Sequence, residues 1–165
     1  MKAKKIILDI FTIFIILLSL FLLTIGLLPK VTSYDAYYVT SDSMKPTIKK
    51  GDLIFTKEVK FEEVEVGDVL TFTKEGSEKW FSHRVVKIDE IGKSFKTKGD
   101  NNEVEDPIYT SYDAVVGRVD KKFPLVGFVP MFLATVWGKG LLVIVYVLYI
   151  SFEIENVASK KRKKG

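Results

Sequence analysis

The sequence contains no cysteine and only one histidine among its 165 residues. Without cysteine the chain cannot form a disulfide bond, an all-thiolate zinc site or a thiol nucleophile, and thiol transpeptidases of the cell surface are excluded. A single histidine also excludes a metal site with several histidine ligands. The length allows about one domain of the usual ~100–200 residues, and 47% hydrophobic with 28% charged residues is typical of a folded chain.

Positive charge is scarce in the middle of the chain and concentrated near its ends. The net charge is +4, yet the section from Lys30 to Pro124 holds 16 Lys and Arg against 18 Asp and Glu. The remaining basic residues flank two apolar runs, which is typical of a membrane protein. A nucleic-acid partner is not expected, because the middle section offers no basic surface.

The first apolar run, from Ile10 to Leu28, has 19 residues without a charge. A helix of about 20 residues crosses the ~30 Å hydrocarbon core of a bilayer, so the run predicts a transmembrane anchor over 6–28. A cleavable signal peptide is the alternative. It is disfavoured because the run exceeds the usual apolar region of ~7–15 residues and no small-x-small cleavage site follows.

The second apolar run predicts a transmembrane helix over 136–154, although Gly138, Lys139 and Gly140 interrupt it. A lysine in mid-membrane costs a few kcal/mol, but Lys139 lies within one turn of the expected interface, beside Trp137, and its amine can reach the headgroups. The alternative is a buried amphipathic helix at the end of a domain.

The basic residues also predict an orientation in the membrane. They precede the first run, in 1–5, and follow the second, in 155–165, so both ends are expected in the cytoplasm. Residues 30–130 then lie on the outer face of the cell membrane, or in the endoplasmic reticulum lumen of a eukaryote.

The section 30–130 consists of short runs rich in β-branched and aromatic residues. The expected strands are AYYVT, DLIFTKEV, DVLTFTK, HRVVKID, KSFKTK and AVVGRV, separated by turn signals that include Glu75-Gly76-Ser77. Strict alternation would place His83 and Val85 on one face and Ile88 on the other. The expected fold class is mainly β: a single compact antiparallel, barrel-like domain between two transmembrane helices.

A further apolar segment, FPLVGFVPMF over 123–132, is broken by two prolines and a glycine. It is too interrupted to span a bilayer, and we expect it to touch the membrane interface. A loop in the domain core is an equally good interpretation.

Two serines and one histidine are candidates for chemistry. Ser41 and Ser43 follow directly after an expected strand, where a turn closed by Pro46 is the simplest interpretation. A serine there can also be a nucleophile if a base and oxyanion donors lie nearby. His83 is the only imidazole, so any serine hydrolase with an imidazole base must use it, although a lone histidine is more often structural.

The acidic candidates are Asp100 and Asp106, both in TKGDNNEVEDP. An Asp-Asn-Asn turn after a glycine explains Asp100 without any chemistry. A carboxylate that fixes the tautomer of a histidine is the functional interpretation.

Four segments in order, SDSMKPTIKKGDLI, GDVLTF, SHRVV and TKGDNNEVED, followed by VVGRV, resemble the type I signal peptidases. The resemblance is to the branch in which histidine replaces the more usual lysine base, found in the endoplasmic reticulum, archaea and some Gram-positive bacteria. It extends from Ser41 to Val119, and it implies a membrane-bound serine endopeptidase that removes signal peptides from exported preproteins. The alternative is a non-catalytic, membrane-tethered β module that binds exported polypeptides.

The resemblance implies roles for the candidate residues by position. Ser43 matches the nucleophile, His83 the general base and Asp106 the acid that orients the histidine, while Asp100 matches a second acid of the family. The Ser41 hydroxyl and the Ser43 amide would form the oxyanion hole. No metal or organic cofactor is implied; exported preproteins and the lipid bilayer are the expected partners, with the secretion translocon as a further candidate.

The sequence departs from the family at Asp42, where the family usually has glycine between the two serines. If the turn requires a positive φ, an aspartate there is strained by about 1 kcal/mol. Its carboxylate would oppose an oxyanion if it pointed inward, so we expect it to face solvent.

Overall fold

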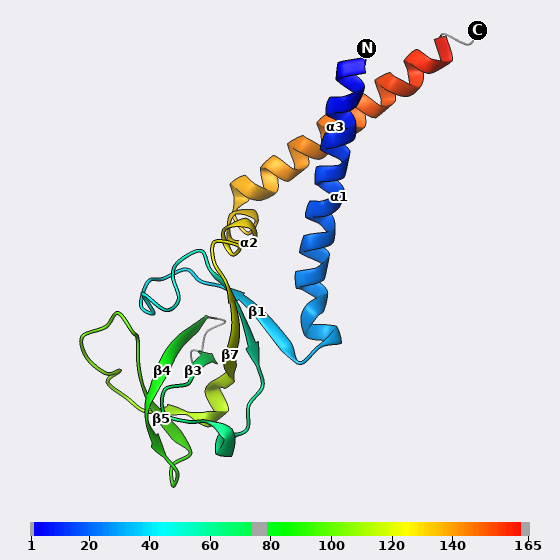
Figure 1. Ribbon diagram of the computed structural model, residues 1–165. Helices are drawn as coiled ribbons and strands as arrows, with labels where there is room; N and C mark the ends of the chain where they lie inside the picture. Colours follow the sequence, from blue (N-terminus) through cyan, green and yellow to red (C-terminus); the bar gives the residue numbers. More distant parts are fainter. Residues whose placement is uncertain (1, 74–78, 163–165) are drawn as a thin grey trace. The chain divides into compact units, whose positions relative to one another are not determined.

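The computed structural model describes residues 2–73 and 79–162 and divides the chain into two compact units, 1–127 and 128–165. The first unit contains helix α1 (Lys2–Val31) and a β domain, and the second contains α2 (Phe128–Leu133) and α3 (Val136–Arg162) (Figure 1). The expected anchor therefore lies within α1 and the second expected span within α3.

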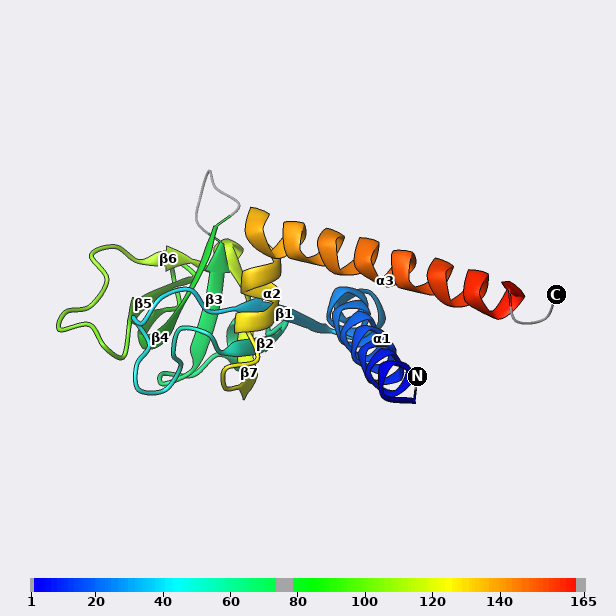
Figure 2. The ribbon, with the colours of Figure 1, turned by 90° about the horizontal axis from the view of Figure 1, so that it is seen from above.

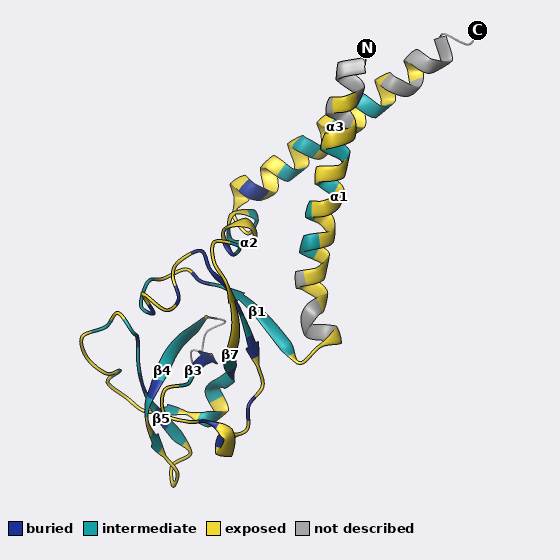
Figure 3. Ribbon diagram, viewed as in Figure 1, coloured by how far each residue is buried: buried dark blue, intermediate teal, exposed yellow. Residues whose placement is uncertain are grey.

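Both long helices are apolar, but they differ in the length of the apolar stretch. Among the described residues one stretch, Val136–Glu155, is long and apolar enough to cross a membrane by length and composition. The apolar stretch of α1, Asp9–Thr24, is shorter. Most described residues of both helices are exposed or only partly covered (Figure 3).

The β domain is one antiparallel sheet of seven strands in the order β1-β2-β7-β3-β4-β5-β6. The strands are β1 (Tyr34–Tyr38), β2 (Leu53–Lys57), β3 (Val69–Thr73), β4 (Trp80–Asp89), β5 (Ser94–Lys98), β6 (Thr110–Ser111) and β7 (Val115–Phe123). Two 3-10 turns, Phe61–Glu63 and Tyr112–Ala114, complete it. The predicted antiparallel β class is thereby confirmed, and the expected break at 75–77 lies outside the described residues.

The sheet curls, so strands that are distant in its order come together. Tyr37 and Tyr38 of β1 contact Trp80 of β4, with ring centroids 4.6 and 6.3 Å apart, although three strands lie between β1 and β4 in the sheet. This closure explains why the domain is barrel-like and why the end of β1 lies near β4.

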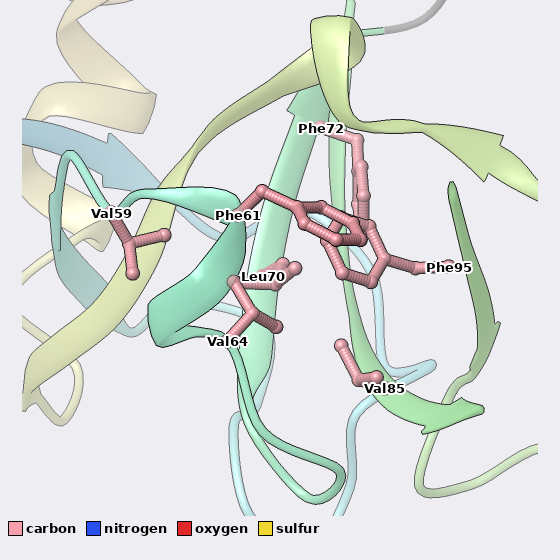
Figure 4. Packing of buried hydrophobic residues seen from close by; sticks show 7 residues of the cluster. All are labelled: Val59, Phe61, Val64, Leu70, Phe72, Val85 and Phe95. Carbon is pink, nitrogen blue, oxygen red and sulfur yellow. The ribbon is translucent and has the colours of Figure 1, made fainter. Parts of the chain in front are cut away.

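The main core lies inside this curl and is formed by buried apolar residues of four elements and their connections (Figure 4). Phe72 and Phe95 are completely buried, and Phe61 packs on Phe95 with ring centroids 5.3 Å apart. The cluster consists of Val59, Phe61, Val64, Leu70, Phe72, Val85 and Phe95.

Strict alternation fails in β4. Val85 belongs to the main core and Ile88 packs against the same core, although alternation puts them on opposite faces. The register of β4 against β5 shifts between Val85 and Lys87, and the extra residue of such a β-bulge turns the following side chains over. The prediction holds up to Val85 and is wrong beyond it.

Candidate active site

The two candidate serines lie on the loop of residues 39–52 between β1 and β2. The loop is closed at its base by Val39, whose amide donates to the Asp52 carbonyl and whose carbonyl accepts from Gly51 N, both at 2.9 Å. Met44 and Ile48 are buried in a second core cluster with Val39 and Ile54. These buried side chains therefore anchor the loop in the core, and the neighbouring serines remain accessible.

Ser41 and Ser43 point at one another on this loop. Their Oγ atoms are 3.4 Å apart, with Ser41 exposed and Ser43 partly buried. A nucleophile and an oxyanion donor need to lie this close, because both must reach the same carbonyl group.

Asp42 lies between the two serines without the strain considered above. Among the described residues other than glycine, only Lys93 and Leu125 have positive φ. The Asp42 carboxylate accepts from the Lys50 amide at 3.0 Å and from Lys45 Nζ at 2.9 Å. These hydrogen bonds, that from Lys45 first, lower the pKa of Asp42. The Asp42 side chain is 41% exposed, as expected for a carboxylate that faces solvent, and its charge is paired with Lys45 within the loop.

His83 on β4 is held by Asp106. His83 Nδ1 lies 2.6 Å from Asp106 Oδ2, and the two side chains are only 12% and 21% exposed. An ionised carboxylate can only accept, so Nδ1 donates and Nε2 keeps its lone pair. The contact with Asp106 thus favours the tautomer that a general base requires.

Thr97 of β5 holds Asp106 in turn. Its hydroxyl donates to Asp106 Oδ2 at 2.6 Å, and its carbonyl accepts from the Asp106 amide at 2.8 Å. Thr97 is completely buried and pairs with Val85 across the sheet. The sheet register therefore sets the distance between the carboxylate and the imidazole.

Asp100 makes a different set of contacts. It accepts from Arg84 Nε at 2.8 Å and from Arg84 Nη2 at 2.6 Å, and the Thr47 hydroxyl donates to it at 2.5 Å. The Arg84 hydrogen bonds are the main reason why the pKa of Asp100 is lowered, against the effect of partial burial. Asp100 therefore links the serine loop, through Thr47, to the residue that follows His83.

The loop after β5 contacts both Ser43, through Asn101, and His83, through Asp106. The Ser43 carbonyl accepts from Asn101 N at 2.8 Å, and a Cβ on Gly99 would lie only 2.6 Å from the same oxygen. Figures 1 and 2 show the loops after β1 and β5 next to each other. Within the described residues no hydrogen bond joins Ser43 to His83; catalytic hydrogen bonds often tighten only when substrate binds.

The structure thus brings His83 and Asp106 into direct contact and assigns Asp100 to a separate ion pair. Sequence reasoning missed Thr97, because a threonine inside a strand has no motif, and its role follows only from strand pairing. It also missed the role of Arg84, for which the one available signal was that Arg84 directly follows His83 in the sequence. Among the described residues no group of three or more His, Asp or Glu could hold a metal ion.

Comparison with known proteins gives one family and several relatives. The family model described as "Signal peptidase, peptidase S26" matches residues 8–90, which include Ser43 and His83 and end before Asp100. The chain is 34% identical over 105 residues to the human signal peptidase complex catalytic subunit SEC11C, covering 58% of this chain and 55% of that protein.

Two further relatives come from a bacterium and a fungus. Signal peptidase I W of Bacillus subtilis is 39% identical over 102 residues, which cover 59% of this chain and 53% of the relative. The SEC11 catalytic subunit of Metarhizium robertsii is 34% identical over 107 residues, which cover 58% and 62%. The chain therefore spans a little over half the length of the curated relatives that it matches.

Proposed function

The chain belongs to the signal peptidase S26 family, and from this premise we propose that it is a membrane-bound serine endopeptidase that removes signal peptides from exported preproteins. The observation that carries the proposal is the 2.6 Å contact between His83 and Asp106 beside the loop of Ser43. A family member that only bound polypeptides would have no need of an oriented imidazole at this place.

The proposed reaction is acyl transfer to Ser43. His83 Nε2 takes the hydroxyl proton as Ser43 Oγ attacks the carbonyl after a small residue, and the Ser41 hydroxyl with the Ser43 amide stabilises the oxyanion. The imidazolium, stabilised by Asp106, then protonates the leaving amine. Water activated by His83 hydrolyses the acyl-enzyme and regenerates the Ser43 hydroxyl.

The substrate would bind in extended form along β1. This strand is the first of the sheet, and among the described residues it pairs with β2 alone; it leads into the serine loop. An extended segment can add to such an edge through main-chain hydrogen bonds. The scissile bond of a preprotein would then reach Ser43 from the end of β1.

We further propose that both apolar helices span the membrane and that both termini are cytoplasmic. The support is the basic residues outside each apolar run, with the catalytic domain of about 30–130 on the outer face and 123–132 at the interface. Confinement to that surface raises the effective concentration of preproteins whose signal peptides lie in the same bilayer. The bilayer and preproteins are thus the proposed partners, with the translocon as a further candidate.

The test is cleavage of a model preprotein by the full chain in detergent, with the new N-terminus of the product determined. We expect wild type to cut after a small residue and His83→Ala to lose at least about 10³-fold in rate, since its base is gone. Lys87→Ala, an exposed position on the same strand, is the control and should cleave normally. Binding without cleavage by wild type, or full activity of His83→Ala, would contradict the proposal.

A further inference from the structure

A buried carboxylate lies at the base of the serine loop, away from the residues with proposed chemical roles. Asp52 is only 3% exposed. Its Oδ2 accepts from the Lys49 amide at 3.0 Å, and its Oδ1 accepts from the Leu125 amide, 73 positions along the chain, at 3.3 Å. A buried charge is costly unless it is hydrogen-bonded, so the hydrogen bonds from these two amides offset the cost of burying Asp52.

The segment 122–127, which consists of the last two residues of β7 and the turn after it, contacts the serine loop at two more points. Lys122 Nζ donates to the carbonyl of Thr47. Gly127 packs so closely that a Cβ there would lie 2.3 Å from the Asp52 carbonyl oxygen. Segment 122–127 therefore holds the base of the loop that carries Ser43. We call this set of contacts, with Asp52 at its centre, the clasp.

The contacts run from this clasp to Ser43 over a few residues. The Lys49 amide bound by Asp52 ends a turn in which Ile48 N donates to the carbonyl of Met44, the residue after Ser43, at 2.9 Å. Thr47, bound by Lys122, also donates to Asp100. Hydrogen bonds thus connect the clasp to Met44, the residue next to Ser43, and to the link between the serine loop and β4.

We propose that Asp52 is a positioning residue, which holds Ser43 within reach of His83 by fixing the loop to segment 122–127. The proposal rests on the proposed serine peptidase function and adds a residue to it. Because reaction rates depend steeply on alignment, a displacement of about 1 Å can cost ~10²-fold in rate while substrate binding is retained. Loss of the clasp should therefore lower kcat and leave KM nearly unchanged.

The first test compares Asp52→Asn with Asp89→Asn in the detergent-solubilised full chain. Asp89 accepts hydrogen bonds from two backbone amides in the turn after β4, at 3.1 Å each. It is therefore a matched control: an aspartate that binds backbone amides outside the clasp. With kcat, KM and the unfolding temperature measured, we expect Asp52→Asn to lose about 10-fold in kcat with KM within about 2-fold, and Asp89→Asn to retain both.

The second test uses an exposed residue, so that folding is not at risk. Lys122→Ala should lower kcat by about 3-fold, Lys122→Arg should restore it because a donor to Thr47 is kept, and the neighbouring Lys121→Ala should have no effect. Wild-type kcat in both Asp52→Asn and Lys122→Ala, assayed well below their unfolding temperatures, would overturn the positioning role. Absence of cleavage by wild type itself would instead overturn the proposed peptidase, and this role with it.

Discussion

The two acidic candidates differ at the level of single atoms. Asp106 faces His83 and Thr97, whereas Asp100 forms a two-point pair with Arg84. A carboxylate paired with an arginine stays ionised and immobile, which suits a structural link. A carboxylate on an imidazole nitrogen controls the tautomer and stabilises the imidazolium. The two aspartates thus have different proposed roles, and the role of each depends on its partner.

Asp106→Asn should lower the cleavage rate by about 10²–10⁴-fold with little change in fold, because an amide can donate to Nδ1 and stabilise the wrong tautomer. The measurement is kcat for a model preprotein. Asp113→Asn, in the 3-10 turn Tyr112–Ala114, is the control, because Asp113 has no proposed part in the reaction. A rate near that of wild type for Asp106→Asn would remove this residue from the mechanism.

Gly99→Ala should also impair cleavage, through contact rather than chemistry. The added Cβ would lie 2.6 Å from the Ser43 carbonyl oxygen and 2.8 Å from the side-chain Nδ2 of Asn102, so the serine loop must shift. Gly140→Ala, which has nothing within 4 Å of its Cβ, is the matched control. We expect a lower kcat and a lower unfolding temperature for Gly99→Ala only; unchanged kcat would show that the two loops can separate without loss.

At the level of elements, the serine loop is joined to β4 by the set of Thr47, Asp100 and Arg84. This link should make stability depend on pH. The pKa of Asp100 is lowered on folding from its ordinary value of 3.8, so its ionised form stabilises the folded state above that value. The stabilisation is lost as the pH falls through the lower pKa of the folded state.

Asp100→Asn should therefore flatten the decline of the unfolding temperature below about pH 4, which lies near the ordinary carboxyl pKa. It should also be less stable than wild type at pH 7. The measurement is unfolding of the full chain in detergent, followed by tryptophan fluorescence. An acid decline as steep as that of wild type would mean that the Asp100 pair does not stabilise the fold.

The strands were predictable because their apolar and β-branched runs are separated by glycine turns. β6 was not, since its two residues pair only with Ser94 and Phe95 and carry no pattern of their own. The bulge in β4 was hidden for a similar reason, because it depends on the register with β5.

Candidate site residues that lie in a motif could be named from the sequence, whereas the residues that hold them in place could not. Ser43, His83 and Asp106 stand in recognisable segments. Thr97 contacts Asp106, nine positions along the chain, and Asp52 contacts Leu125, 73 positions along it; neither contact has a sequence motif, so only the folded structure reveals them.

For the whole molecule, the proposed orientation can be tested with cysteine, because the chain has none of its own. Ile91 is 99% exposed in the turn after β4, so Ile91→Cys should react with a membrane-impermeant maleimide added outside intact cells. Lys2→Cys should react only after permeabilisation, since the basic end is expected inside. Labelling of Lys2→Cys from outside would contradict the two-pass arrangement.

Ser43 is the proposed nucleophile, and its neighbour Ser41, 3.4 Å away between Oγ atoms, is proposed only to stabilise the oxyanion. The most direct measurement is the cleavage rate of one preprotein by wild type, Ser43→Ala and Ser41→Ala, with the cut site identified. We predict background cleavage for Ser43→Ala and a loss of about 10²–10³-fold at the same cut site for Ser41→Ala. Cleavage that survives in Ser43→Ala and disappears in Ser41→Ala would contradict these roles and make Ser41 the nucleophile.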